Sequence, residues 1–420
     1  MEQSVKQRIA DIRQGNVPAG YRKTKLGIIP ADWNVELLGS IFVARDERVD
    51  NSFDTPLFSL TIEDGITAKT ERYEREFLVK KEKNYKKVYP GDFVYNPMNL
   101  RFGAIARYHG NTPCSVSGYY DVFYLKNPSF YGDFIETLLQ SDILLKEYAN
   151  AATGSLIEKQ RVHFSNFCKI GFMQPNELEI TKIAKILGCC DRVIALKKEL
   201  IAEKKKQKKA LMQKLLNPDS GFRLPGFSGE WKNIVLEDIC SFAGGGTPDT
   251  KREDFWNGTI PWISSADVEE KNFSVNPHRF ITPEAIKFSA TQLCPQKSLL
   301  IVSRVGVGKI AITQEPLCTS QDFTNLTKIN GNVIFYAYLL KTILEAKARQ
   351  TQGTSIKGIT VAEIKHFQLA VPQSLKEQQA IADILSAADK EIDLLEQELV
   401  QQEQKKKSLM QLLLTGIVRV

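Results

Sequence analysis

The sequence predicts an α+β protein with two globular segments separated by two long antiparallel coiled-coil helices. A pseudo-twofold axis is expected to relate the two halves of the chain. Three observations support this prediction. The chain ends in a segment with coiled-coil periodicity, residues 374–415; a related segment occurs 198 residues earlier; and the stretch before each segment alternates short β-type runs with turns. A repeat of this kind constrains the fold more strongly than any single element.

The C-terminal segment repeats apolar residues at alternating steps of four and three, which keeps one stripe facing a partner helix. Eight of its ten stripe positions are apolar, and the stripe consists of Ile381, Leu385, Ala388, Ile392, Leu395, Leu399, Gln402, Lys406, Leu409 and Leu413. Pro372 precedes the segment and Gly416 follows it, at positions where helices tolerate these residues. About 40 residues at roughly 1.5 Å each predict a helix of roughly 60 Å.

An earlier segment repeats this helix. Fifteen of the 38 aligned pairs between residues 179–216 and 377–414 are identical, and Trp33 and Trp231 show the same offset of 198 residues. Two copies are too few for a solenoid, so we expect the two helices to lie against each other. The expected parts are an N-terminal helical segment (1–19), a first globular domain (20–174), a first spacer helix (175–220), a second globular domain (221–371) and a second spacer helix (372–420).

The two globular segments have mixed character. Short β-type runs alternate with turns rich in Gly, Asn and Pro. Each segment also has one helical stretch, Ser129 to Ala149 and Val333 to Ala348, and one glycine turn with a basic residue, at 101–105 and 304–310. Glycine lets the backbone turn tightly while the basic side chain projects. We therefore expect an α+β domain around a curved sheet in each segment.

The composition narrows the class of protein. Of 420 residues, 43% are hydrophobic, which is enough for globular cores, and the net charge of +7 permits nucleic-acid binding without demanding it. The seven cysteines form no C-x-x-C pair, which favours reduced thiols in a cytoplasm. No apolar run approaches a membrane span, and the four scattered histidines predict no metal site. We expect a soluble, cytoplasmic protein with no membrane partner.

Several motifs occur in a characteristic order. The chain has Gly-Gly-Gly-Thr-Pro at 244–248, a tryptophan-containing motif at 256–263, and a Pro-x-x-Leu-x-Glu-Gln pattern at 372–378. With the repeated halves and a tryptophan at the start of each domain, these residues resemble a Type I restriction-modification specificity (S) subunit over nearly the whole chain. The first half departs from the pattern, because Glu-Ile at 179–180 replaces Glu-Gln and the glycine turn and tryptophan pair are missing.

The resemblance implies a non-catalytic subunit that binds double-stranded DNA, each globular segment being a target recognition domain for one half of a bipartite sequence. The spacer helices would hold the two domains a fixed distance apart, so that adding or deleting a heptad changes the spacer between half-sites. They would also dock two methyltransferase (M) subunits and, through them, restriction/translocase (R) subunits. S-adenosylmethionine, ATP and magnesium are expected on these partners, with no cofactor or metal in this chain.

Candidate DNA-contacting residues follow from the chemistry of base recognition. Arg and Lys suit guanine, Asn and Gln suit adenine, and hydroxyl and backbone groups bind phosphate. In the first domain the candidates are Thr61, Asn96, Asn99, Arg101, Tyr119, Tyr120, Ser155, Lys159 and Arg161. In the second they are Gly244, Gly245, Gly246, Thr247, Ser264, Ser265, Arg304, Lys309, Ser320, Gln321, Ser355 and Lys357. An ordinary turn or surface role is the alternative for each.

A lysine run from Lys197 to Lys209 permits two interpretations. Lys197, Lys204 and Lys208 occupy stripe positions of the first spacer helix. The run is either a solvated stretch where the coiled coil loosens, or a basic strip that faces the DNA spacer or an acidic surface of a methyltransferase. The charge pattern alone does not decide between them.

Two alternative functions belong to other classes. Residues 242–246 match the F-x-G-x-G turn that approaches S-adenosylmethionine, and 96–99 are similar to N-P-P-F of the amino-methyltransferases, which would indicate an S-adenosylmethionine-dependent DNA methyltransferase. Against it, the aromatic residue that would stack on a flipped base is absent, and Thr247 and Pro248 interrupt the helix expected after the glycines. A non-DNA coiled-coil scaffold would share the helices but not explain the basic glycine turns.

Overall fold

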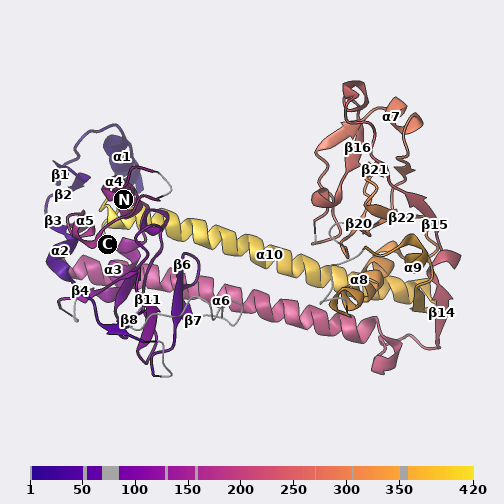
Figure 1. Ribbon diagram of the computed structural model, residues 1–420, viewed down its shortest axis with the longest axis horizontal. Helices are drawn as coiled ribbons and strands as arrows, with labels where there is room; N and C mark the ends of the chain where they lie inside the picture. Colours follow the sequence, from indigo (N-terminus) through magenta and orange to yellow (C-terminus); the bar gives the residue numbers. More distant parts are fainter. Residues whose placement is uncertain are drawn as a thin grey trace. The chain divides into compact units, whose positions relative to one another are not determined.

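The computed structural model describes residues 2–50, 54–68, 85–127, 131–156, 159–269, 271–304, 307–350 and 358–420 (Figure 1). The chain divides into two compact units, residues 1–196 with 399–420 and residues 197–398. Each unit joins one globular segment to parts of both long helices.

The two predicted long helices are confirmed as α6 (Glu177–Leu215) and α10 (Leu375–Leu414), which lie alongside each other (Figure 1). Their ion pairs show the direction of packing. In the second unit Lys197 pairs with Glu398 at 2.6 Å and Lys204 with Glu391 at 2.6 Å. Because the partner's number falls as the lysine's number rises, the helices are antiparallel.

Apolar side chains of the two helices share a core in each unit. In the first unit Ile183 and Leu187 of α6 are buried in the same cluster as Leu413 of α10. In the second unit Leu215 of α6 is buried in the same cluster as Leu385 of α10. The seam predicted from the four-and-three spacing is therefore used within both units.

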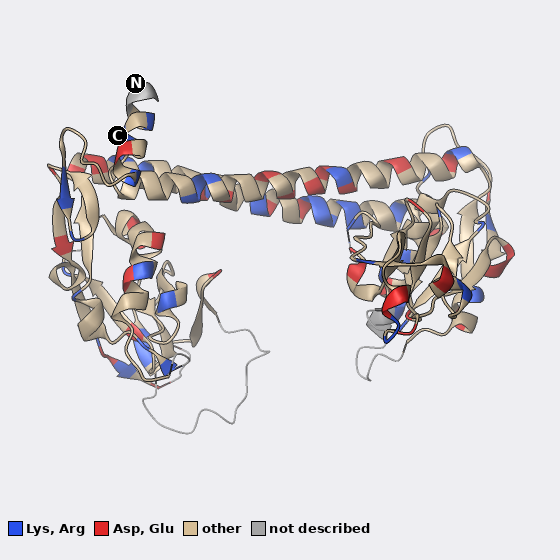
Figure 2. Cartoon of the chain, turned by 90° about the horizontal axis from the view of Figure 1, so that it is seen from above, with Lys and Arg blue, Asp and Glu red and all other residues tan. Residues whose placement is uncertain are grey.

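The lysine run of α6 is ion-paired with α10. Besides Lys197 and Lys204, Lys205 lies 2.8 Å from Glu396, and Lys208 pairs with Asp389. Basic and acidic residues accordingly alternate along the two helices (Figure 2). These four side chains are neither a solvated stretch nor a free basic strip, because their charges neutralise carboxylates of the partner helix. The ion pairs favour one alignment of the two helices along the seam.

The first globular segment contains an antiparallel sheet with strand order β10-β9-β12-β4. A second sheet has the order β11-β8-β5, β6 and β7 form a hairpin, and β3 pairs with β13. The strands of this segment are β3 (Asn34–Leu37), β4 (Phe42–Arg45), β5 (Arg48–Val49), β6 (Phe58–Thr61), β7 (Gly65–Ala68), β8 (Tyr85–Val88), β9 (Phe93–Tyr95), β10 (Ile105–Arg107), β11 (Cys114–Ser117), β12 (Asp121–Leu125) and β13 (Gly171–Gln174). Before them come α1 (Glu2–Arg13), β1 (Tyr21–Thr24) and β2 (Gly27–Pro30), and α2 (Leu38–Ile41) joins β3 to β4.

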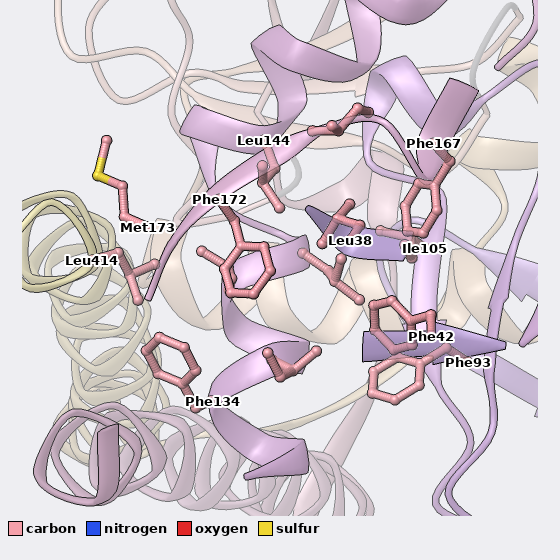
Figure 3. Packing of buried hydrophobic residues seen from close by; sticks show 14 of the residues in the cluster. Leu38, Phe42, Phe93, Ile105, Phe134, Leu144, Phe167, Phe172, Met173 and Leu414 are labelled. Atoms are coloured by element: carbon pink, nitrogen blue, oxygen red, sulfur yellow. The ribbon is translucent and has the colours of Figure 1, made fainter. Parts of the chain in front are cut away.

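An aromatic core supports this sheet. Phe42 and Phe93 from the sheet and Phe167 from α5 (Phe164–Phe167) point into one cluster, which Leu414 of α10 also enters (Figure 3). The rings of Phe42 and Phe123 meet edge to face with centroids 4.7 Å apart, a favourable geometry for aromatic pairs. The first segment is thereby attached to the long helix that follows it and to the end of the other.

The second globular segment contains an antiparallel sheet of order β15-β22-β19-β20. A mixed sheet has the order β17-β16-β21-β18, in which β16 and β21 are parallel, and β14 pairs with β23. The strands are β14 (Trp231–Val235), β15 (Ser241–Gly244), β16 (Ile260–Ile263), β17 (Arg279–Ile281), β18 (Leu293–Cys294), β19 (Leu299–Val302), β20 (Ile310–Ile312), β21 (Leu317–Thr319), β22 (Phe323–Thr327) and β23 (Gln368–Pro372). The helices are α7 (Pro283–Lys287), α8 (Val333–Gln350) and α9 (Val361–Lys365).

The main sheets of the two segments have the same topology. Taken in chain order, the four strands of each sheet are arranged first, fourth, second, third, and every neighbouring pair is antiparallel. The glycine turns with a basic residue, one in each segment, connect equivalent strands, β9 to β10 and β19 to β20. The duplication therefore extends to the globular segments, although their sequences are much less alike than the helices.

The predicted helix at 129–149 is wrong in one respect. The described part of this stretch forms two helices, α3 (Gly132–Leu139) and α4 (Asp142–Ala151). The break occurs because Ser141, in an extended conformation, caps α4 by accepting a hydrogen bond from the Leu144 backbone N–H. The helix predicted at 333–348 is present as α8.

Each unit also contains an ion pair between a buried glutamate and a partly exposed arginine at the start of a long helix. In the first unit Arg419 donates to Glu179 at 2.5 and 2.8 Å. In the second unit Arg223 donates to Glu377 at 2.6 and 2.7 Å. In both, the arginine follows the end of one long helix and the glutamate lies in the first turn of the other. The pair fixes the antiparallel helix ends against each other.

Candidate functional site

Loops from three strands meet at one edge of the main sheet in the first segment. Tyr95 at the end of β9 pairs with Ile105 at the start of β10 and with Asp121 at the start of β12. The loops that precede or follow these residues, 96–104 and 118–120, therefore lie at the same edge. They contain most of the candidates predicted for this segment.

The 96–104 turn has a defined conformation. Asn96 Oδ1 accepts a hydrogen bond from the Met98 backbone N–H at 3.1 Å, and Gly103 adopts a left-handed φ of 95° that favours glycine. Arg101 lies 4.6 Å from the ring centroid of Phe102, and its Nη1 donates to Gln160 Oε1 at 3.0 Å. A cation on an aromatic face is thus presented at the tip of the turn.

A second loop packs on this turn. Thr153 and Arg161 exchange backbone hydrogen bonds of 2.9 and 3.0 Å, and the Val162 N–H donates to the Pro97 carbonyl at 2.9 Å. The exposed candidates of this loop are Ser155, Lys159 and Arg161. The structure therefore brings them close to Asn96, Asn99 and Arg101.

The remaining candidates of the first segment occupy neighbouring turns. Thr61 is exposed at the β6–β7 turn, where its hydroxyl accepts from the Asp64 N–H at 3.0 Å. Tyr119 is exposed in the β11–β12 turn, whereas burial raises the pKa of Tyr120 and its ring packs against the core. Tyr119 therefore has more surface available for a ligand than Tyr120.

In the second segment the glycine loop after β15 packs tightly against the backbone of the segments 290–291 and 319–320. The Gly246 N–H donates to the Thr319 carbonyl at 2.8 Å, and a Cβ added to Gly245 would overlap the carbonyl oxygen of Ser320. Glycine is required here because the backbone of this loop lies very close to the backbone of residues 319–320. Thr247 donates a hydrogen bond to Gln321, which joins two exposed candidates.

Two further candidate positions lie beside this loop. The Ser264 N–H and hydroxyl both donate to Asp267, at 2.7 and 2.8 Å, and Ser265 begins the short helix that this contact caps. The Ser320 N–H donates to the Ile263 carbonyl at 2.8 Å. The ends of the parallel strands β16 and β21 thus place Ser264 and Ser320 next to the glycine loop.

The β19–β20 turn adds a basic group at the same side. The Ser303 N–H donates to the Asp322 carbonyl at 2.8 Å, which places the exposed Arg304 beside the 320–322 loop. Lys309 is half-buried opposite Val302. The candidates Ser355 and Lys357 lie outside the described residues.

Several residues at these edges were not singled out from the sequence. Phe102 and Ile62 are exposed beside the first segment's loops, and Arg279 of β17 stacks on Trp262 in the second segment. The tryptophan motif at 256–263 was the available signal for Arg279. The pairing of β16 with β17, which brings the two side chains together, was not visible in the sequence.

Within the described ranges, no group of three or more His, Cys, Asp and Glu residues is placed to hold a metal ion. None of the helices in the described part of the chain combines the length and apolar character that crossing a membrane requires.

Comparison with known proteins finds a family model that matches the second half of the chain. Residues 228–404 match the family of the Type I restriction modification DNA specificity domain. This range contains β14 to β23 and most of α10. The second half of the chain is therefore similar to a Type I restriction modification DNA specificity domain, and the matched range covers less than half of the chain.

Individual relatives agree with this family. The chain is similar to the MjaIX specificity subunit of Methanocaldococcus jannaschii, 34% identical over 41% of this chain and 40% of the relative, and to the EcoR124I/EcoR124II specificity subunit of Escherichia coli, 32% identical over 49% and 51%. The matches thus span about half the length of these relatives or less. A putative MjaX specificity subunit is 24% identical over 95% of this chain and 97% of the relative.

Solved structures show the same fold. The chain resembles the S subunit of a Type I restriction-modification system from M. genitalium with a TM-score of 0.55, covering 91% of this chain and 96% of that one at 15% identity. It resembles a chain from a type I R-M system structure with a TM-score of 0.60, covering 93% and 99% at 15% identity. At this identity the similarity concerns the fold.

Proposed function

We propose that the chain is the DNA-recognition subunit of a Type I restriction-modification complex. Each globular segment contacts one half of a bipartite target, and the long helices determine the spacer between the halves. The observation that carries this proposal is the gathering of basic, amide and hydroxyl side chains at one edge of each main sheet, in a chain whose second half matches a DNA specificity domain.

The proposed contacts divide into two kinds. Arg101, Asn99 and Gln321 have the donors and acceptors that distinguish bases in the major groove. Hydroxyl and backbone groups such as those of Ser155 and Ser265 suit phosphate oxygens, which position the protein without reading sequence. Affinity for duplex DNA then falls steeply with salt, because bound cations release counterions.

We propose further that the long helices dock two methyltransferase subunits and, through them, restriction/translocase subunits. Val193, Leu196 and Leu200 lie at i, i+3 and i+7, so they share one face of α6, and each is exposed. A row of exposed apolar side chains on a helix is a feature of protein interfaces. Leu394 and Val400 of α10 are exposed as well.

In this proposal the chain is not a catalyst. S-adenosylmethionine, ATP and magnesium belong to the partner subunits. The one turn similar to a cofactor loop, at 242–246, does not fit S-adenosylmethionine, because Gly245 and Gly246 are packed against the backbone of residues 290–291 and 319–320. A DNA methyltransferase activity of the isolated chain is the rival, and binding of S-adenosylmethionine by the purified chain would favour it.

The decisive experiment maps methylated adenines in DNA from cells that express this chain with its cognate methyltransferase. We expect a bipartite motif, and exchange of residues 20–174 for the equivalent segment of a relative should change one half of it. A continuous motif, or a change in both halves, would contradict the proposal that each globular segment recognises one half of the target.

Docking is tested by co-purification. Leu196→Glu should weaken recovery of the methyltransferase with the chain, because a charge would enter an apolar interface. Leu178→Glu is a matched control, since Leu178 is also an exposed leucine of α6 but lies outside the 193–200 row. Equal recovery with the two variants would argue against docking on this face.

A further inference from the structure

Arg279 is held against a rigid aromatic surface in the second segment. Its guanidinium carbon lies 4.2 Å from the ring centroid of Trp262, its register partner on the neighbouring strand. Trp262 is buried and fixed in place, because its Nε1 donates to the Gly246 carbonyl at 2.9 Å and its ring meets Trp256 edge to face at 5.1 Å. The side chain of Arg279 is thus directed by a surface that is itself immobilised.

A carboxylate restrains the same guanidinium. Arg279 Nη2 lies 3.5 Å from Asp267 Oδ2, and the Asp267 side chain is only 8% exposed. This oxygen is already fixed by the two hydrogen bonds from Ser264. The Arg279 side chain is nevertheless 46% exposed, and within the described residues its guanidinium makes no hydrogen bond shorter than this contact. The N–H donors of the Arg279 guanidinium are therefore held in position and remain available to a ligand.

A second stacked arginine of the segment differs in this respect. Arg252 lies 3.9 Å from the Phe255 ring centroid and is 51% exposed. Its Nε and Nη2 both donate to the Asp254 carboxylate, at 3.1 and 2.5 Å. This bidentate contact occupies the two parallel N–H donors of Arg252 that would otherwise bind two acceptor atoms of a base. Arg252 is therefore suited to a surface ion pair, whereas Arg279 is suited to binding a ligand.

We propose that Arg279 recognises a guanine in the half-site contacted by the second segment. A guanidinium presents two parallel N–H donors that match O6 and N7 of guanine. Stacking and the Asp267 contact restrict the side chain before DNA arrives, which lowers the entropy cost of the contact. The tryptophan motif then acts as a positioning element, linking Arg279 to Gly246 and hence to the predicted contact loop. This inference rests on the proposed function.

The test uses the full chain together with its methyltransferase. Methylated adenines are mapped for wild type, Arg279→Ala, Arg279→Lys and the control Arg252→Ala, and binding is measured on duplexes with each base at every position of the motif. We expect Arg279→Ala to reduce discrimination at one guanine of one half by about 10- to 100-fold. Arg279→Lys retains the charge but not the fork, so it should relax the same position. Arg252→Ala should leave the motif unchanged.

The outcomes separate this inference from the function on which it rests. An unchanged motif with Arg279→Ala, a uniform loss of affinity for all sequences, or relaxation at a base other than guanine would each overturn the inference while leaving a bipartite wild-type motif intact. Absence of a bipartite motif in the wild type would overturn both. Melting temperatures of the variants show whether a lost motif reflects lost folding, and Arg279→Lys supplies the result if Arg279→Ala does not fold.

Discussion

Replacement of Arg223 by alanine tests the ion pair that closes the second unit. Glu377 lies in the first turn of α10, its side chain is 2% exposed, and Arg223 holds both of its carboxylate oxygens. The variant would leave this carboxylate buried and without its cation. Breaking a buried ion pair by removing one partner costs about 3–5 kcal/mol. Because the Arg223 side chain is 28% exposed, we expect a smaller loss of about 2–3 kcal/mol.

The expected loss translates into a measurable shift. For a unit of this size each kcal/mol lowers the melting temperature by about 2–4 °C, so Arg223→Ala should lower it by about 4–12 °C. Differential scanning calorimetry of the purified chain measures the shift. Glu377→Gln in the Arg223→Ala background should recover part of it, because the uncompensated charge is removed.

Arg252→Ala is the control for Arg223→Ala. Arg252→Ala removes an arginine from an exposed pair with Asp254, in the same unit, and should shift the melting temperature much less. If Arg223→Ala and Arg252→Ala had equal effects, the reasoning from burial would be refuted. It would also be refuted if Glu377→Gln destabilised the Arg223→Ala protein further.

Three further predictions follow from the structure. The hydrogen bond to Glu136 raises the pKa of His109. The pair therefore stabilises the fold below about pH 6.5, and this stabilisation is lost as the pH rises through the raised pKa. The melting-temperature difference between wild type and His109→Gln should accordingly shrink from pH 6 to pH 9. Gly245→Ala should destabilise the chain by about 1–3 kcal/mol in denaturant titrations, because its methyl group would overlap backbone. Matched heptads inserted into α6 and α10 beside the pair Lys197 and Glu398 lengthen the helices by about 10 Å, so the spacer of the methylated motif should grow by about 3 bp.

Each of these predictions has a contradicting result. A pH-independent difference for His109→Gln would show that its pair with Glu136 does not titrate as described. Gly244→Ala is the matched control for Gly245→Ala, since a Cβ at Gly244 meets no atom within 4 Å, and equal destabilisation by the two would argue against the close approach. An unchanged spacer after heptad insertion would contradict the role proposed for the helices.

The long helices were predictable because their determinants are local. The spacing of apolar residues from Ile381 to Leu413 specifies a stripe whatever surrounds it, and the repeat at 179–216 is visible by alignment alone. The same reasoning failed at Ser141, where a capping hydrogen bond divides α3 from α4. Ser141 stands between Gln140 and Asp142 within a run of Leu and Ile residues that is compatible with a continuous helix, and the structure shows that it caps one instead.

The candidate site was only partly predictable. Residues such as Arg101 and Thr247 stand out because glycine turns carry them, but their neighbours at 153–161 and 320–322 come from elsewhere in the chain. Arg279 was missed because its significance depends on Trp262 across a strand pair.

By itself, the sequence determined the doubled plan, the two helices, the family resemblance and the chemical types of residue available for DNA. Tertiary structure alone decided that α6 lysines are neutralised by α10 carboxylates, that both main sheets share one topology, and which loops meet at their edges. The physical reason is the range of the interactions. Helix periodicity acts between residues three or four apart, whereas strand pairing, ion pairs and stacking join residues far apart in the chain, whose meeting depends on the whole fold.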